Sequence, residues 1–215
     1  MILNYKSYWR KSGLKGKWGN IFLERLSINN PKNVLEIGVF CGVTARNTCD
    51  FLNKMNGNNF SYIGVDLFGG DQNEHKDEIE PTFLKNQKFS NPLKNIYYNY
   101  ILKENLNSIE SVNKLLNKYR DNTRLIAGDT NKVLKELDLQ NIDFTFLDGG
   151  HSYQTVINDL KILYDSMKDK KKVILCDDYG KESYIPEVEK AINDFTKQNN
   201  LKLNLIENRF AEIIT

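Results

Sequence analysis

Short apolar runs alternate along the chain with longer stretches in which apolar residues recur every three or four positions. The runs have the length of buried strands, and a glycine or an acid completes each one. They lie at residues 34–38, 61–65, 125–127, 144–147 and 173–176. Helical periodicity predicts helices at 18–28, at 44–55, beginning at 133–137, at 156–167 and at 186–195. This alternation predicts an α/β fold, a doubly wound and mostly parallel sheet with helices on both faces.

Two regions of the chain interrupt the alternation. Residues 201–206 and 210–214 are apolar runs around Glu207-Asn-Arg209, which favours an antiparallel hairpin at the sheet edge. Residues 69–122 are too long for an ordinary crossover. They are predicted to form an insertion above the carboxyl ends of the strands, with a helix at 109–119 and an aromatic cluster at Tyr97, Tyr98 and Tyr100. Acceptor recognition would sit there; the alternative is a peripheral embellishment that touches no substrate.

Residues 1–30 precede the first strand and are predicted to be an N-terminal helical segment. The stretch 11–16 in front of the helix contains two glycines. The segment either packs on the domain or acts as a lid in which Tyr5, Trp9 or Trp18 closes over a ligand. The sequence favours neither reading.

Composition narrows the class of protein. The 215 residues suit one domain with appendages. Lys+Arg number 30 against 28 Asp+Glu, so no nucleic-acid partner is indicated. The three cysteines show no disulfide or zinc spacing, which indicates free thiols in a reducing compartment. No signal peptide and no apolar run near the ~20 residues of a membrane helix is evident, so a cytoplasmic protein without a membrane partner is expected.

Candidate chemistry stands at the ends of two predicted strands. Asp148-Gly-Gly-His151 follows one run, and Asp177-Asp178 follows another. Ligands bind at the carboxyl ends of the strands in open parallel sheets, so neighbouring strands would bring three carboxylates and an imidazole into one crevice. The alternatives are that Asp148 caps the next helix, that His151 is structural, and that one of the paired acids is a solvated turn residue.

A glycine turn and two further acids indicate a nucleoside cofactor. In Glu36-Ile-Gly38-Val-Phe-Cys41-Gly42 the backbone can approach a ligand between a strand and a helix N-terminus. Asp66 ends the next strand, where a carboxylate can accept both ribose hydroxyls. Asp129 ends the third, where it can accept a hydrogen bond from an adenine amino group. The glycine spacing differs from the GxGxxG of nicotinamide enzymes.

These successive motifs resemble those of class I S-adenosylmethionine-dependent methyltransferases. The element Asp148-Gly-Gly-His151-Ser-Tyr153 with the later Asp177-Asp178 is similar to a narrower branch, the metal-dependent sugar O-methyltransferases that act on macrolide and aminocoumarin antibiotics. The resemblance implies a methyltransferase domain over residues 31–215. It also implies a Rossmann-like sheet of seven strands with the last antiparallel.

The resemblance also implies roles for individual residues. Glu36, Gly38 and Gly42 would cradle the methionine portion of S-adenosylmethionine, Asp66 would hold the ribose and Asp129 the adenine. The set of predicted cofactor-binding residues is completed by Cys41, Thr130 and Asp148. Cys41 is interpreted as a small packing residue rather than a nucleophile. The isolated His75 is assigned to the surface.

Transfer of a methyl group to a sugar hydroxyl needs removal of a proton from a weak acid. A hard divalent cation such as Mg²⁺, held by Asp148, Asp177 and Asp178, would lower the pKa of that hydroxyl. His151 is the candidate general base. The predicted function is metal-assisted O-methylation of a sugar or other small hydroxylated acceptor. The alternatives are a metal-independent small-molecule methyltransferase and a non-catalytic cofactor-binding module. The oligomeric state is open, with a homo-oligomer one option.

Overall fold

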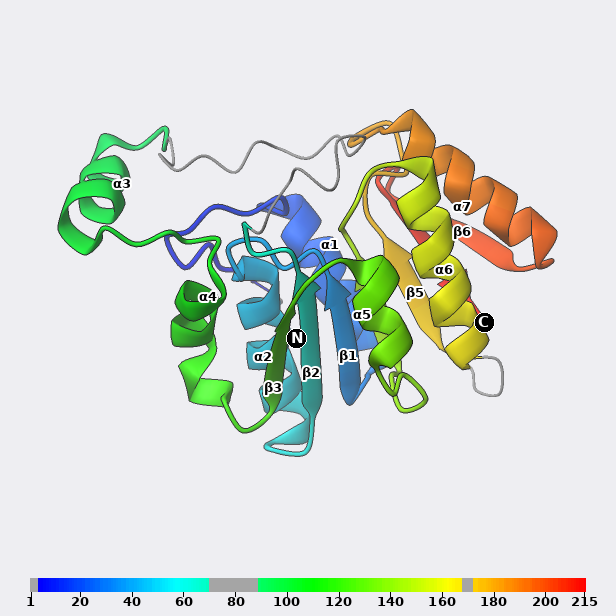
Figure 1. Ribbon diagram of the computed structural model, residues 1–215, viewed down its shortest axis with the longest axis horizontal. Coiled ribbons are helices and arrows are strands. Elements are labelled where there is room, and N and C mark those ends of the chain that lie inside the picture. Colours follow the sequence, from blue (N-terminus) through cyan, green and yellow to red (C-terminus); the bar gives the residue numbers. More distant parts are fainter. Residues whose placement is uncertain (1–3, 70–88, 168–171) are drawn as a thin grey trace.

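The computed structural model describes residues 4–69, 89–167 and 172–215, and within them seven strands form one sheet in the order β3-β2-β1-β4-β5-β7-β6 (Figure 1). Six strands run in the same direction, and β7 alone runs antiparallel to them. The predicted fold is therefore confirmed. The strands are β1 Asn33–Ile37, β2 Ser61–Asp66, β3 Thr123–Ala127, β4 Phe144–Leu147, β5 Val173–Cys176, β6 Lys202–Ile206 and β7 Phe210–Ile214.

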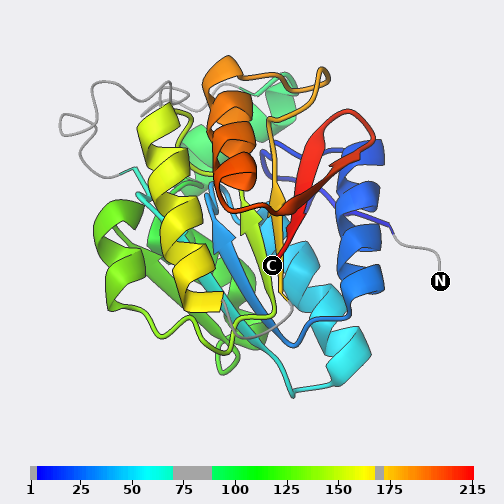
Figure 2. The same cartoon turned by 90° about the vertical axis from the view of Figure 1, so that its right-hand side faces the viewer.

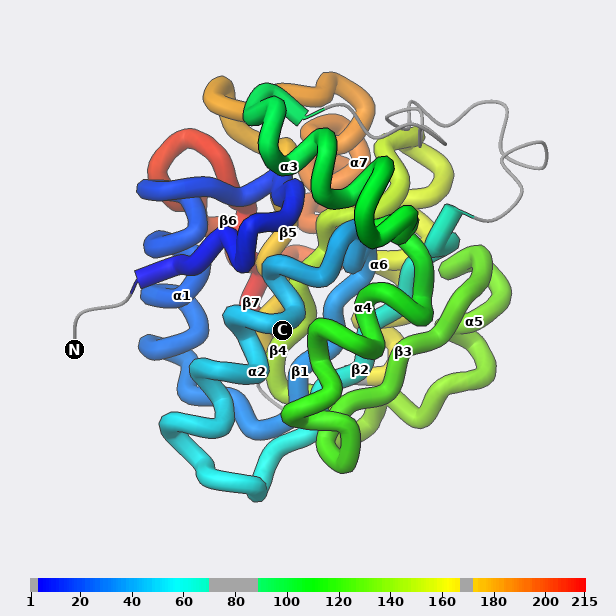
Figure 3. The backbone as a smooth tube through the Cα atoms, turned by 90° about the vertical axis from the view of Figure 1, so that its left-hand side faces the viewer, coloured from blue at the N-terminus to red at the C-terminus, as the bar shows by residue number. Residues whose placement is uncertain are grey.

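Helices cover both faces of the sheet, as the two turned views show (Figures 2 and 3). One face packs on α1 Lys17–Asn29, α2 Val43–Asn56 and α4 Ile109–Leu116, with Phe22, Leu52 and Val112 in the shared apolar cluster. The other face packs on α5 Thr130–Glu136, α6 Tyr153–Met167 and α7 Pro186–Gln198. Because these helices present apolar residues every three or four positions, each buries one side and leaves the other in water.

The predicted antiparallel hairpin at the sheet edge is confirmed, with β6 as the edge strand. β7 lies between β5 and β6, and Cys176 of β5 pairs with Ala211 of β7. The residues just before β7 therefore lie at the carboxyl end of β5. This placement brings the hairpin turn next to the two acids that follow β5.

The insertion is described from residue 89 onward. It contains the short helix α3 Pro92–Ile96, the π-helical turn η2 Tyr97–Leu102, α4 and the 3₁₀ turn η3 Asn117–Tyr119. α3 and η2 extend away from the sheet (Figure 1). Of the predicted aromatic cluster, Tyr98 is buried and Tyr100 is exposed. His75 lies outside the described residues.

Most predicted boundaries agree with the structure to within one or two residues. Three helix ends differ by three residues: α5 begins at Thr130 rather than near Val133, α6 begins at Tyr153 rather than at 156, and α7 ends at Gln198 rather than at 195. α5 begins early because the Asp129 side chain accepts a hydrogen bond from the backbone N–H of Asn131 and so caps the helix. All three cysteines are free and buried. No helix in the described part of the chain is long and apolar enough to cross a membrane.

Candidate active site

A cavity of about 390 Å³ opens at the carboxyl ends of the parallel strands. Its wall contains every predicted site residue except Glu36 and Gly42: Gly38, Cys41, Asp66, Asp129, Thr130, Asp148, His151, Asp177 and Asp178. Glu36 is buried in β1, and Gly42 is the residue before α2. The strand order places β1 beside β4 and β4 beside β5, so residues far apart in the sequence share one wall.

The glycine turn brings β1 and β4 into main-chain contact. Gly38 has a φ of 89°, and a Cβ there would lie 1.8 Å from the main-chain oxygen of Asp148. No side chain fits at Gly38 unless the backbone moves. After the turn, α2 begins at Val43, and Gly42 before it provides no side chain to cap the first N–H groups of the helix. An uncapped helix N-terminus beside a cavity favours a carboxylate ligand.

Glu36 is a buried carboxyl with one unsatisfied oxygen. Its Oε2 accepts a hydrogen bond of 2.9 Å from the Tyr62 hydroxyl. Its Oε1 is buried and has no partner within the described residues. Burial raises the pKa of Glu36 to about 8, the Tyr62 hydrogen bond lowers it and the charge of Asp66 adds to the rise. A buried oxygen without a partner costs free energy unless a hydrogen-bond donor or a cation reaches it.

The two acids predicted for the nucleoside are held by backbone groups. Asp66 accepts hydrogen bonds of 2.7 Å from the N–H groups of Phe40 and Phe68. Burial raises the pKa of Asp66, and these bonds act against that rise. Asp129 uses Oδ1 to cap α5, and Thr130 follows it on the cavity wall. The strand ends that carry Asp66 and Asp129 therefore set the directions of the two side chains.

His151 forms a pair with Asp178 at the opposite side of the cavity. Its Nε2 lies 3.0 Å from Oδ2 of Asp178, and Oδ1 of Asp178 accepts a short hydrogen bond from the Ser183 hydroxyl. Asp178 has a φ of 59°, a left-handed conformation that is uncommon for a residue with a side chain. An aspartate engaged on both oxygens orients the imidazole and stabilises its protonated form.

Asp177 forms a bidentate ion pair with Arg209. Nε and Nη2 of Arg209 donate to Oδ1 and Oδ2 of Asp177 at 2.7 and 2.6 Å. The two side chains are buried, with exposed fractions of 3% for Asp177 and 8% for Arg209. Burial lowers the pKa of Arg209, but the hydrogen bonds and charge of Asp177 outweigh it and the net shift is upward. Arg209 therefore stays charged.

Asp148 is the open carboxylate of the site. It lines the cavity, and no described residue donates a hydrogen bond to its side chain. Burial raises the pKa of Asp148 well above its ordinary value, and the charges of Asp177, Asp178 and Glu36 add to the rise. It does not cap α6, because the Ser152 hydroxyl accepts from the N–H of Thr155 at the start of that helix. The helix-cap interpretation of Asp148 is therefore wrong.

Cys41 is a packing residue, as interpreted from the sequence. It is 1% exposed and belongs to a small apolar cluster with Tyr98 and Leu106. Burial raises the pKa of its thiol to about 12, so the thiolate is disfavoured at neutral pH.

The N-terminal segment lies over the cavity, where Lys11, Ser12 and Gly13 form part of the wall. The Tyr5 hydroxyl shares hydrogen bonds with Ser12 at 3.1 Å and with Thr44 of α2 at 2.8 Å. Of the three aromatic residues predicted for a lid, Tyr5 is buried against α2, Trp18 packs on Phe210, and Trp9 packs on Tyr97 and Tyr98.

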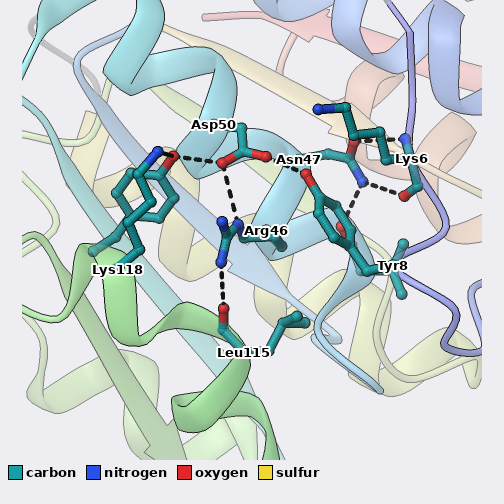
Figure 4. A network of polar contacts seen from close by, with 9 residues as sticks. Lys6, Tyr8, Arg46, Asn47, Asp50, Leu115 and Lys118 are labelled. Carbon is teal, nitrogen blue, oxygen red and sulfur yellow. Dashed lines mark hydrogen bonds and ion pairs between the residues drawn. The ribbon is translucent and has the colours of Figure 1, made fainter.

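A polar network fastens this segment to α2 and α4 (Figure 4). Asn47 of α2 exchanges hydrogen bonds of 2.8 Å with the main chain of Lys6. Asp50 accepts hydrogen bonds from the hydroxyls of Tyr8 and Tyr119 and forms an ion pair with Arg46. Arg46 also donates to the main-chain oxygen of Leu115. The covering segment is thus bonded to the helices beneath it.

The predicted cation set does not fit this arrangement. Both oxygens of Asp177 bind Arg209, and both oxygens of Asp178 bind His151 and Ser183. Among the residues that the structure describes, no group of three or more acidic, histidine or cysteine side chains is placed to hold a metal ion. A Mg²⁺ ion demands near-octahedral oxygen ligands, and Asp148 alone remains to supply one.

S-adenosylmethionine, in contrast, fits the residues that line the cavity. The turn at Gly38 leaves room at the main chain, and the uncapped start of α2 suits a carboxylate. Asp148 on the wall is an acceptor for an ammonium group, Glu36 is buried in β1, and Asp66 and Asp129 lie at the strand ends assigned to the nucleoside. These residues belong to β1, β2, β3 and β4, four strands that the sheet holds in fixed order.

Arg209 and Ser183 contact the predicted site acids, but the sequence did not lead us to predict them as site residues. Arg209 was interpreted as part of a hairpin link at the sheet edge. A signal was available, because an antiparallel last strand next to β5 places the residue before it beside Asp177 and Asp178. Ser183 carries no comparable signal, since its contact with Asp178 depends on the path of an irregular loop.

The Rossmann-like sheet has its last strand antiparallel, and acids at the ends of β2 to β5 line one cavity. Together these features define the class as that of the class I methyltransferases. Residues 35–179 match the family model described as "Methyltransferase domain". The chain belongs to this family, which makes it an S-adenosylmethionine-dependent methyltransferase. No curated protein sequence matches the chain.

Several solved structures share the fold. Cofactor-bound Rv0187 from MTB is 12% identical, with a TM-score of 0.64 over 95% of this chain and 82% of that chain. The O-methyltransferase NovP is 17% identical, with a TM-score of 0.58 over 89% and 75%. CalS11, described as a TDP-rhamnose 3′-O-methyltransferase of calicheamicin biosynthesis, is 16% identical, with a TM-score of 0.56 over 90% and 76%. At these identities the likeness concerns the fold.

Proposed function

We propose that this protein transfers a methyl group from S-adenosylmethionine to a hydroxyl oxygen of a sugar or similar small polyol, with His151 as the general base. The observation that carries the proposal is the His151–Asp178 pair on the wall of the cavity that holds the predicted cofactor residues. A histidine that is oriented by a carboxylate and faces a donor site suits removal of a proton from a hydroxyl.

The cofactor, when bound, supplies an activated methyl group on a sulfonium. His151 accepts the proton of the acceptor hydroxyl as that oxygen forms its bond to the methyl carbon. The sulfur–methyl bond breaks and its electron pair stays on sulfur, so the products are a methyl ether and S-adenosylhomocysteine. Asp178 stabilises the imidazolium that forms, and Ser183 fixes Asp178. Asp148 is the open acceptor that orients the incoming hydroxyl or the cofactor's ammonium group.

The preference for a sugar rests on two observations. Aromatic side chains pack together above the glycine turn: Trp9 and Phe89 lie against Tyr98, and Phe40 of the cavity wall packs on the same cluster. Aromatic faces are suitable surfaces for the apolar face of a sugar ring. The fold neighbour CalS11 is described as a sugar O-methyltransferase. No step of the proposed reaction passes through the cation expected from the sequence, because Asp177 and Asp178 are otherwise engaged.

A methyl-transfer assay with labelled S-adenosylmethionine and a panel of sugars, nucleotide sugars and glycosides tests this function. We expect the label to appear as an ether on a hydroxyl oxygen. Binding of S-adenosylhomocysteine without turnover on any hydroxylated acceptor would instead favour a cofactor-binding module. Transfer to nitrogen or carbon acceptors would contradict the proposed substrate class.

A further inference from the structure

Among the described residues, three carboxylates and one guanidinium meet where β4 and β5 end. Asp148, Asp177 and Asp178 all line the cavity, and Arg209 is the positive side chain that contacts this group. In the predicted metal site a divalent cation would balance these charges and would use the oxygens of Asp177. Here the guanidinium occupies those oxygens with two parallel hydrogen bonds, the geometry that Arg and carboxylate groups share best.

Arg209 is held in this position by its main chain as well as its side chain. Its carbonyl oxygen accepts hydrogen bonds from the N–H groups of Tyr179 and Gly180 at 3.2 and 3.0 Å. A Cβ at Gly180 would lie 2.0 Å from the main-chain oxygen of Asn208, so the loop after β5 touches the hairpin turn directly. The pairing of Cys176 with Ala211 sets this register.

Two aromatic rings enclose the guanidinium. Its central carbon lies 5.5 Å from the ring of Trp18 and 5.5 Å from that of Phe210. A cation over an aromatic face is stabilised electrostatically, more so where water is excluded. Trp18 comes from α1, so three segments of the chain converge on this one charge.

We propose that the guanidinium of Arg209 takes the place of a divalent cation in this site. It holds Asp177 away from the acceptor and leaves His151, Asp178 and Asp148 to act on it, so methyl transfer proceeds without a metal ion. Arg209 is a positioning residue, since it acts through Asp177. Only the activity arm of this inference rests on the proposed function.

Mn²⁺ binding to the apoprotein, followed by electron paramagnetic resonance and calorimetry, tests the proposal without any acceptor. We expect no stoichiometric binding by the wild-type protein at submillimolar Mn²⁺. Arg209→Gln frees Asp177 and should gain about tenfold or more in Mn²⁺ affinity, because hard cations bind where carboxylate oxygens are available. Arg209→Gln/Asp177→Asn should lose that gain, and Arg120→Gln, at an exposed arginine, should match the wild type.

Arg209→Lys covers the case in which Arg209→Gln does not fold. It keeps the charge, so it should bind no Mn²⁺ while its kcat falls and its KM for S-adenosylmethionine stays unchanged. In the activity arm, methyl transfer by the wild type should be the same with and without EDTA. Stoichiometric Mn²⁺ binding by the wild type that Asp177→Asn abolishes would overturn the proposal, as would EDTA-sensitive turnover or an Arg209→Gln protein whose Mn²⁺ affinity equals that of the wild type. Failure to find an acceptor would leave the Mn²⁺ result intact.

Discussion

The acids in the two halves of the site are used in opposite ways. Glu36 and Asp66, from β1 and β2, receive hydrogen bonds from a tyrosine and from backbone N–H groups, and one oxygen of Glu36 has no described partner. Asp177 and Asp178, after β5, are each bonded on both oxygens by side chains of the protein. We propose that the first half binds the cofactor and that the second half is a preorganised reaction surface.

Removing the base should produce the largest change. His151→Ala is expected to lower kcat ~10²- to 10⁴-fold, the usual contribution of a general base. The affinity for S-adenosylhomocysteine should not change, because His151 belongs to the second half of the wall. The rates come from the methyl-transfer assay, and calorimetry gives the affinity. Partial rescue by added imidazole would sharpen the assignment, and loss of cofactor affinity would break the division into halves.

Breaking the ion pair should destabilise the fold. Asp177→Asn leaves the buried Arg209 charge without its partner and should lower the free energy of unfolding by roughly 3–5 kcal/mol. Urea denaturation of the ligand-free protein measures this. Asp121→Asn, at an exposed aspartate, is the matched control and should stay within about 0.5 kcal/mol of the wild type. An Asp177→Asn protein as stable as the wild type would contradict the pairing.

Glu36 should make the ligand-free protein less stable as pH rises. Its pKa is about 8 when folded against about 4.5 ordinarily. Between these values the folded state keeps a proton that the unfolded state has released, so this group disfavours folding by roughly 1.4 kcal/mol for each pH unit gained in the window. Glu36→Gln should flatten that slope between pH 5 and 8 in chemical denaturation. Asp148, whose pKa is also raised, leaves part of the slope in place.

The control for this experiment is Glu24→Gln, at an exposed position of α1. It should retain the slope of the wild type. If Glu36→Gln retained it too, Glu36 would not be the unsatisfied carboxyl that distinguishes the first half.

The smallest expected effect concerns the support of the base. Ser183→Ala removes the hydroxyl that bonds Asp178 and should lower kcat by about three- to tenfold, the equivalent of one hydrogen bond of ~1 kcal/mol. KM for S-adenosylmethionine should not change. A change in KM with kcat preserved would place Ser183 in the binding half instead.

Much of the fold could be predicted, because its signals are local. The apolar run 144–147 and Asp148 after it predict a buried strand and the position of its carboxyl end, and this prediction does not require knowing which strands lie beside it. The resemblance to class I methyltransferases supplied the antiparallel last strand, and the structure confirms it. Some helix ends were misplaced by about one turn; the start of α5 is one, since Asp129 serves as a helix cap as well as following a strand.

The partners of the acids could not be predicted in the same way. Asp177 and Arg209 lie 32 positions apart and meet only because β7 inserts next to β5. The sequence shows three acids and therefore suggests a metal, but which cation faces them depends on strand order. The contact of Ser183 with Asp178 depends on a left-handed backbone at Asp178, which no residue pattern encodes.

Asp50 helps to hold the covering N-terminal segment on the helices beneath it. Its carboxylate joins Tyr8 of the covering segment to Tyr119 beyond α4, and both hang from one turn of α2. A force that pulls on the N-terminal segment would therefore load its bonds to α2, from Asn47 to Lys6 and from Asp50 to Tyr8, before it reached the sheet. Under tension the cavity should lose its cover while the seven strands stay paired.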